Sequence, residues 1–217
     1  MIRAIAFDFD GVLAESVNVK TRAYAILFED EKEETIQQIL DYHLKNEGVS
    51  RFEKIKYIYE NLLEKSLSQD LFVSLCDRYS KLVKNEVVDS PWVEGAFEFL
   101  EKYKNEYTFF VVSGTPEDEL KEIIFRRGME EFFSEVRGSP KKKDIILTEI
   151  IQKYGYIASE LVFVGDAQTD WVGAKITGVP FIWRRVSVNA PTLSGFDGPT
   201  IPSLSYLSNC LSNLAVT

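Results

Sequence analysis

Histidine and cysteine are scarce in this sequence of 217 residues, which contains one histidine and two cysteines. A lone His43 gives neither a histidine-based triad nor a zinc cluster. It lies in a helical, partly exposed pattern, and we expect no functional role for it. Cys76 and Cys210 lie far apart, in different kinds of segment. They are therefore interpreted as two free thiols in a reducing cytoplasm rather than as a disulfide.

Long apolar runs and excess basic charge are also missing. No stretch of 18 apolar residues is present, which excludes a membrane span, and the acids at positions 8 and 10 argue against a signal peptide. The 25 basic residues are outnumbered by 34 acidic ones, giving a net charge of −9. Nucleic-acid binding favours a basic face. We expect a cytoplasmic protein that binds neither membranes nor nucleic acid, and the sequence does not indicate an oligomeric state.

The N-terminus contains the most informative stretch of the sequence. Residues 2–7 are apolar except for Arg3, as in a buried parallel strand, and Asp8, Asp10 and Gly11 follow. Because side chains alternate along a strand, both aspartates lean to the same side. Two such charges about 4 Å apart repel by roughly 4 kcal/mol at an effective dielectric constant of about 20. A divalent cation offsets that repulsion, and Mg²⁺ favours carboxylates together with phosphate oxygens.

A long helical region follows this strand. Apolar residues recur at helical spacing over residues 17–28, 35–44, 50–63 and 68–82, and Ser50 with Glu53 suggests a capping box. A helical stretch of about 70 residues is too long for a crossover connection. We therefore predict an all-helical insert over residues 16–89, within an α/β core formed by residues 1–15 and 90–217.

Strands and helices alternate in the rest of the chain. Pro91 is expected to open a helix over residues 92–104, and strands are expected at 107–112, 161–164 and 180–183. The intervening segments are predicted to be helices. Residues 184–202 are predicted to form a loop with a short edge strand. This alternation predicts a three-layer, Rossmann-like parallel sheet. Three strand ends carry polar residues at the edge where such sheets bind ligands, namely Asp8 with Asp10, Ser113 with Gly114, and Gly165 with Asp166.

These motifs, in this order, resemble those of the haloacid dehalogenase-like (HAD) hydrolase superfamily. Asp8-Phe9-Asp10-Gly11-Val12 is similar to its DxDG[TV] motif, Ser113-Gly114 follows a hydrophobic strand, a lysine opens a helix, and residues 165–170 match GDxxxD. The resemblance covers the chain up to about residue 183. It implies the phosphatase branch of the superfamily, with a helical cap inserted after the first motif.

The resemblance also implies roles for individual residues. Asp8 is the expected nucleophile, forming an aspartyl-phosphate, and Asp10 is the acid and base for the leaving group and the water. Asp8, the carbonyl oxygen of Asp10 and Asp166 are expected to hold Mg²⁺. Ser113 and Gly114 are expected to bind phosphoryl oxygens, helped by the N-terminus of the following helix.

The resemblance also implies a positioning aspartate and a catalytic lysine. Asp170 is expected to orient a metal-bound water or the catalytic lysine. That lysine is either Lys143, which lies 23 residues before Asp166, or Lys141, which lies 25 before it. The sequence Lys143-Asp144-Ile145-Ile146-Leu147 resembles the shorter spacing, and no proline follows Lys141, so we favour Lys143.

Asp10 indicates which reaction to expect, because related dehalogenases lack the second aspartate. The predicted function is Mg²⁺-dependent hydrolysis of a small phosphorylated metabolite, such as a sugar phosphate or a phosphoglycolate-like ester. A cap that closes over the site favours a substrate of this size.

Two alternatives stay open. Residues 48–51 resemble a segment with which sugar phosphomutases bind a distal phosphate, and Arg51 and Lys20 are candidates to contact an anionic substrate. However, those mutases carry a histidine at the position of Lys20. A non-catalytic binding domain is a lesser alternative, which predicts loss of at least one acid, and none is missing.

Overall fold

The computed structural model describes residues 1–185 and 192–214. Its centre is a parallel sheet of six strands in the order β3-β2-β1-β4-β5-β6. The strands are β1 (Ala4–Phe7), β2 (Thr108–Pro116), β3 (Phe133–Ser139), β4 (Leu161–Gly165), β5 (Phe181–Arg184) and β6 (Thr200–Ile201). The helices are α1 (Val17–Leu27), α2 (Glu33–Lys45), α3 (Arg51–Tyr57), α4 (Gln69–Asp89), α5 (Ala96–Tyr103), α6 (Glu117–Arg126), α7 (Lys143–Tyr154), α8 (Gln168–Thr177) and α9 (Leu207–Leu214). The predicted α/β class with a parallel sheet is confirmed.

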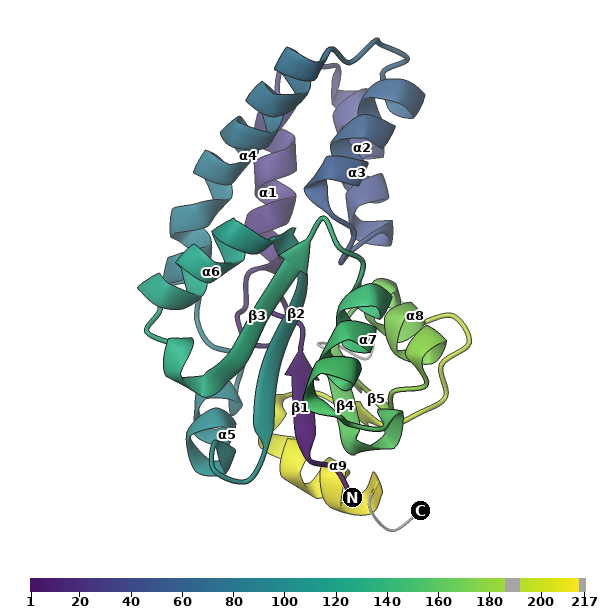
Figure 1. Ribbon diagram of the computed structural model, residues 1–217. Helices are drawn as coiled ribbons and strands as arrows, with labels where there is room; N and C mark the ends of the chain where they lie inside the picture. The colour runs from purple at the N-terminus through teal and green to yellow at the C-terminus, as the bar shows by residue number, and fades with distance from the viewer. Residues whose placement is uncertain (186–191, 215–217) are drawn as a thin grey trace.

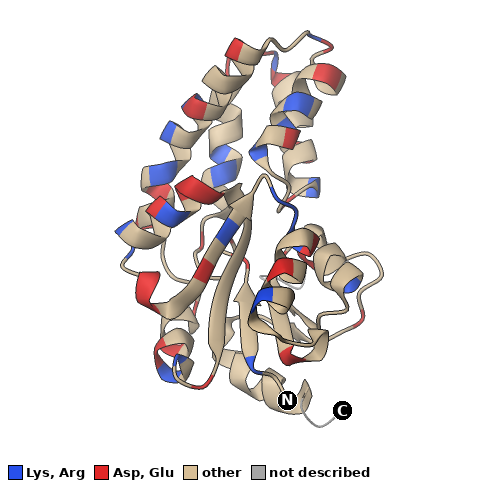
Figure 2. Cartoon of the chain, in the orientation of Figure 1, with Lys and Arg blue, Asp and Glu red and all other residues tan. Residues whose placement is uncertain are grey.

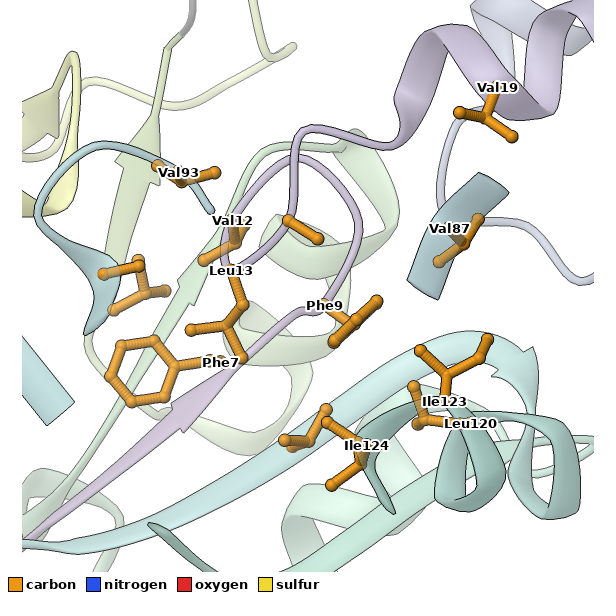
Figure 3. Close-up of a cluster of buried hydrophobic side chains, with 14 of the residues drawn as sticks. Phe7, Phe9, Val12, Leu13, Val19, Val87, Val93, Leu120, Ile123 and Ile124 are labelled. Carbon is orange, nitrogen blue, oxygen red and sulfur yellow. The ribbon is translucent and has the colours of Figure 1, made fainter. Parts of the chain in front are cut away.

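Alternate residues of the strands pack into two different helical layers. Ile5 and Phe7 of β1 belong to a buried cluster that includes residues of α5, α6 and α9. Ala4 and Ala6 face the other way, into a cluster shared with α7 and α8. Figure 3 shows part of the first cluster, with side chains from the end of β1, from α4 and from α6. Because both faces of β1 are covered, its sequence is apolar throughout, as expected for a central parallel strand.

Helices α1 to α4 stand together beyond the carboxyl ends of the strands (Figure 1). Ala23 of α1, Ile55 of α3 and Val83 of α4 are buried in the same cluster as Ile5. Apolar packing therefore continues from the sheet into the four helices. The division of the chain into a core and an insert at residues 16–89 stays a prediction.

Three sequence predictions for the core were wrong in detail. The helix expected at residues 92–104 begins only at Ala96, because Gly95 before it has a left-handed conformation with φ of 78°. The strand expected at residues 107–112 continues to Pro116, so Ser113 and Gly114 lie inside β2 rather than after it. Strand β3 was not predicted, because polar residues at the edge of the sheet interrupt its apolar pattern.

The predicted capping box at the start of α3 is also absent. The Ser50 hydroxyl accepts a hydrogen bond from the Phe52 N–H at 3.3 Å, and the Glu53 N–H donates to the Ser50 carbonyl oxygen instead. Ser50 therefore caps the helix alone.

Neither the charge distribution on the surface nor the two cysteines departs from what is usual in a globular protein. Acidic and basic residues are interspersed along the helices (Figure 2). Cys76 is buried, Cys210 is half-buried, and both are free thiols. Within the described ranges, no helix combines the length and apolar character needed to cross a bilayer.

Candidate active site

The carboxyl ends of β1, β2 and β4 bring most of the predicted site residues together. Phe7 pairs with Val111 and with Val164, so the residues that follow these three positions lie side by side at one edge of the sheet, although β2 itself continues to Pro116. A cavity of about 50 Å³ lies at this edge, below helices α1 and α3. Its lining includes seven of the predicted residues, Asp8, Asp10, Lys20, Arg51, Ser113, Gly114 and Asp166.

Lys143, the first residue of α7, lies buried between two carboxylates. Its Nζ donates to Asp8 Oδ2 at 2.9 Å and to Asp170 Oδ1. Burial alone lowers the pKa of Lys143, but the charges of Asp170 and Asp8 outweigh burial and raise this pKa above its ordinary value. The ammonium group is therefore charged at neutral pH and reduces the repulsion between the two carboxylates.

Lys141, the alternative lysine, lies elsewhere. Its Nζ donates to Glu149 Oε1 at 2.6 Å in an exposed ion pair. The structure thus brings Lys143, and not Lys141, to Asp8.

Asp170 uses both of its carboxylate oxygens. Oδ1 accepts from Lys143, and Oδ2 accepts from the backbone N–H groups of Asp166 at 3.2 Å and Ala167 at 3.0 Å. Burial raises the pKa of Asp170 to about 6, against the lowering effect of Lys143. Gly165 is required here because a Cβ atom at that position would overlap the Asp170 carboxyl group. Asp170 therefore holds Lys143 in place and shapes the loop that carries Asp166.

The carboxylate of Asp166 is the strongest candidate for a metal ligand. One oxygen each of Asp8, Asp166 and Asp170 lie within 4.8 Å of one another. Burial, followed by the charges of Asp8 and Asp170, raises the pKa of Asp166 well above its ordinary value. Across residues 1–185 and 192–214, the hydrogen bonds of Asp166 involve its main chain and none reaches its carboxylate.

This set of oxygen donors fits Mg²⁺. A hard divalent cation prefers carboxylate and carbonyl oxygens, and its charge offsets the repulsion that raises the pKa of Asp166. Gly11 contributes to this fit, since it has φ of 74° and a Cβ atom there would overlap the Asp166 carboxylate. A side chain at position 11 would therefore displace the Asp166 carboxylate.

Asp10 lies in a separate network of hydrogen bonds. Its Oδ1 accepts from the Ser16 hydroxyl at 2.6 Å, and its Oδ2 accepts from the Thr115 hydroxyl at 3.1 Å and from Lys20. Burial alone raises the pKa of Asp10, but the Lys20 charge and these hydrogen bonds outweigh it and lower the pKa. Asp10 is consequently ionised in this structure, the state in which it can accept a proton.

Ser113 and Gly114 lie against the loop between α2 and α3. The Ser113 hydroxyl accepts from the Thr115 N–H at 3.2 Å, and Ser113 is buried at the cavity wall. A Cβ atom at Gly114 would overlap the carbonyl group of Gly48, so only glycine permits this approach of the helical region to β2. Helix α6 begins at Glu117, three residues after Gly114.

Arg51 lines the cavity, but its charge already has a partner. Its guanidinium group forms a buried, two-pronged ion pair with Glu119 of α6, in which the Nη1 to Oε2 distance is 3.0 Å. The Ser80 hydroxyl also donates to Glu119, and the Arg51 guanidinium lies 4.7 Å from the centre of the Tyr79 ring. The pair joins α3 to α6, so Arg51 connects the helical region to the core.

Sequence reasoning singled out neither Tyr24 nor Lys54, which line the cavity, and it was wrong about the exposure of His43. His43 was expected to be partly exposed, but it is buried at the cavity wall together with Tyr24 and Lys54. The helical spacing of Lys54 with Arg51 and Ile58 could have placed it on the buried face of its helix. No signal in the sequence indicated that His43 and Lys54 meet.

Arg184, at the end of β5, was also missed. Its Nη1 donates to the carbonyl oxygen of Gly11 at 2.9 Å, and its Nη2 donates to Glu15 Oε1 at 2.6 Å. Arg184 thereby fixes the loop that follows Asp8 and Asp10.

Comparison with known proteins gives consistent results. A family model described as haloacid dehalogenase-like hydrolase matches residues 5–184. A phosphoglycolate phosphatase from Aliivibrio fischeri is 26% identical over 186 residues, covering 82% of this chain and 81% of that protein. A crystal structure of a predicted phosphoglycolate phosphatase from Haemophilus somnus superposes with a TM-score of 0.78 at 19% identity, covering 97% and 98% of the two chains. YfnB from Bacillus subtilis, bound to magnesium, has a TM-score of 0.72 at 16% identity, covering 97% and 99%.

Proposed function

The chain belongs to the haloacid dehalogenase-like hydrolase family, and from this premise we propose that it is a Mg²⁺-dependent phosphatase of a small phosphorylated metabolite. The arrangement of Asp8 supports this most strongly. Asp8 faces the cavity, accepts a hydrogen bond from Lys143, and lies beside the carboxylate of Asp166, which accepts no hydrogen bond from the residues that the structure describes. The activity named for the Aliivibrio fischeri relative agrees with this substrate class.

Asp8 is the proposed nucleophile. Its Oδ1 accepts from the Phe9 N–H at 2.7 Å and its Oδ2 accepts from Lys143, so the carboxylate is fixed in one orientation. An oxygen of Asp8 attacks phosphorus in line with the ester oxygen, the P–O bond to that oxygen breaks, and an aspartyl-phosphate forms. Orientation of the nucleophile before the reaction removes much of the entropic barrier.

Asp8, the carbonyl oxygen of Asp10 and Asp166 are the proposed ligands of Mg²⁺. When bound, the cation neutralises negative charge on the carboxylates and on the transferring phosphoryl group. Lys143, the Ser113 hydroxyl and the Gly114 N–H are proposed to bind the phosphoryl oxygens. Lys143 therefore has two functions, because it also separates Asp8 from Asp170.

Asp10 is the proposed acid and base. As a base it takes a proton from the water that attacks the aspartyl-phosphate, and the lowered pKa of Asp10 suits that step. As an acid it protonates the leaving alkoxide in the first step, for which Asp10 must carry a proton. Lys20 stabilises the ionised form, so substrate binding must draw the Lys20 ammonium from Asp10 toward the anionic substrate.

Residues 16–89 are the proposed cap, which covers the cavity and excludes water from it. Contacts between Gly48 and Gly114 and between the Thr169 hydroxyl and the Glu47 carbonyl oxygen, at 3.3 Å, correspond to a closed arrangement. The small cavity favours a small substrate over a phosphoprotein. The two free thiols support the cytoplasm as the proposed location.

The test is hydrolysis of p-nitrophenyl phosphate and of a panel of phosphorylated metabolites. We expect phosphate release with Mg²⁺, none with EDTA, and none from the Asp8→Asn variant. An inert wild-type protein across the panel refutes the proposal and leaves the non-catalytic binding domain. Isomerised sugar phosphate with little free phosphate indicates the mutase instead, which the pairing of Arg51 with Glu119 disfavours.

A further inference from the structure

A buried ion pair at the wall of the active-site cavity joins the helical region to the core. Arg51 of α3 and Glu119 of α6 are 6% and 9% exposed, and the guanidinium group donates to both carboxylate oxygens. The Ser80 hydroxyl of α4 donates to the same carboxylate, so three helices meet at Glu119. Arg51 belongs to the lining of the cavity that contains Asp8, and Glu119 lies outside that lining.

Glu119 gives Arg51 the anionic partner that a substrate would otherwise supply. A guanidinium group binds a carboxylate or a phosphate best through two parallel hydrogen bonds, and Glu119 already accepts both. A second anionic group on the substrate would have to displace Glu119 from Arg51. Displacement would leave the Glu119 carboxylate buried without its cation, which is strongly unfavourable.

The other two cations of the cavity lining are engaged as well. Lys20 donates to Asp10 and, at 2.8 Å, to the Thr115 hydroxyl. Lys54 Nζ lies 2.9 Å from His43 Nδ1, and burial, followed by the charge of Lys20, lowers the pKa of Lys54 to about 7. Its ammonium form is therefore only partly populated at neutral pH. Among the described residues, the lining thus offers no fully charged cation that lacks a partner.

The fixed charge of the cavity lining is negative. Among the described residues the lining contains four carboxylates and three cations, namely Asp8, Asp10, Glu47, Asp166, Lys20, Arg51 and Lys54. In the proposed function, Mg²⁺ and the donors of the core compensate the charge of the phosphoryl group. A second anionic group would enter a site with an excess of carboxylates, and like charges repel.

We propose that Glu119 is a specificity-determining residue, which pairs with Arg51 and thereby selects phosphate esters whose alcohol part is uncharged. Such an alcohol leaves the pair of Arg51 and Glu119 intact. Monophosphates of sugars and polyols are the expected substrates, and esters with a second phosphate or a carboxylate are poorer ligands. Specificity of this kind is a difference between two affinities, which the fixed carboxylate of Glu119 sets. The inference rests on the proposed phosphatase function and names the substrate class within it.

Calorimetric binding to the Asp8→Asn protein with Mg²⁺ tests this inference separately from turnover. The two probes are glycerol 3-phosphate and 3-phosphoglycerate, in which a carboxylate replaces the terminal hydroxymethyl group. We expect the neutral ester to bind at least as tightly as the acid. Addition of Glu119→Gln should raise the affinity for the acid about tenfold or more, because the unpaired Arg51 charge then gains an anionic partner. The affinity for the neutral ester should change less than about threefold.

Glu122→Gln is the matched control. Glu122 also joins α6 to α4, through Lys84, but this ion pair is exposed, so both affinities should stay unchanged. Further addition of Arg51→Met to the Glu119→Gln protein should remove the gain for the acid. This double change separates the charge of Arg51 from a general loosening of the helical region.

Two results overturn the inference. One is tighter binding of the acid than of the neutral ester while Glu119 is in place, and the other is an equal effect of Glu119→Gln on both esters. The first comparison needs no change at Glu119, so it decides even if Glu119→Gln fails to fold. Failure of the proposed function shows differently, as wild-type protein that hydrolyses neither ester whatever the affinities are.

Discussion

Replacement of Lys143 by methionine is the most informative single change at the site. Methionine keeps most of the length of lysine but removes its charge. The substitution leaves the buried carboxylates of Asp8 and Asp170 without the ammonium group that each now contacts. Asp166, whose pKa is already raised, then lies beside two unpaired carboxylates.

The expected loss of stability is large. Removal of one partner from a buried ion pair costs about 3–5 kcal/mol. For a chain of this size each kcal/mol lowers Tm by about 2–4 °C, so we expect Tm of the Mg²⁺-free protein to fall by about 6–20 °C. Mg²⁺ should restore part of this loss, because a ligand that binds only the folded state stabilises it.

Activity should fall as well. Loss of one donor that stabilises transition-state charge typically lowers kcat by about 10²–10³-fold. Lys141→Met is the control, because the ion pair of Lys141 with Glu149 is exposed and solvent screens it, so its loss should change stability little. Tm by calorimetry and kcat with p-nitrophenyl phosphate measure both effects. Full activity of Lys143→Met, or an equal loss in Lys141→Met, would refute the reasoning.

Three further predictions follow from buried charges. Asp166→Asn should abolish Mg²⁺-dependent turnover. It should also raise Tm of the Mg²⁺-free protein at neutral pH, because it removes a carboxylate whose ionisation the fold opposes. A lower Tm than that of the wild type would contradict this. The pKa of His43 is lowered to about 3, so between about pH 6.5 and 3 the unfolded chain binds one more proton than the folded chain. The free energy of unfolding should therefore decrease by up to about 1.4 kcal/mol for each pH unit by which the pH falls in this range. The decrease should be smaller in His43→Asn, which lacks the titrating ring. Denaturant unfolding at several pH values measures this, and parallel curves would contradict it. Glu119→Gln should lower the free energy of unfolding by about 3–5 kcal/mol by leaving Arg51 buried and unpaired, and an unchanged denaturant midpoint would contradict this.

Much of the core could be predicted from local patterns. The apolar run before Asp8 marks a strand covered on both faces, and the polar residues at positions 113 and 166 follow apolar runs of the same kind. Because parallel strands end at one edge of the sheet, their meeting at one site follows from the pattern alone. Strand β3 was not predicted because an edge strand needs less apolar sequence than a central one. The start of α5 was predicted wrongly because it depends on the conformation of Gly95.

The pairings within the helical region could not be predicted. Arg51 meets Glu119 across 68 positions of the chain, and His43 meets Lys54 from a different helix. Such contacts depend on how helices pack, which the spacing of apolar residues does not specify. For this reason Arg51 is only a candidate to contact an anionic substrate when the sequence is considered alone, whereas the structure shows its charge already paired.

The measurement that tests the central claim most directly is isolation of the covalent intermediate. Asp10→Asn protein mixed with Mg²⁺ and p-nitrophenyl phosphate should accumulate the aspartyl-phosphate, because this leaving group needs no proton and the second step lacks its base. After acid quenching, peptide mass spectrometry should locate one phosphoryl group on Asp8 and none in the Asp8→Asn, Asp10→Asn double variant. A phosphoryl group on any other residue, or release of p-nitrophenol in a pre-steady-state burst without a modified Asp8, would contradict the account.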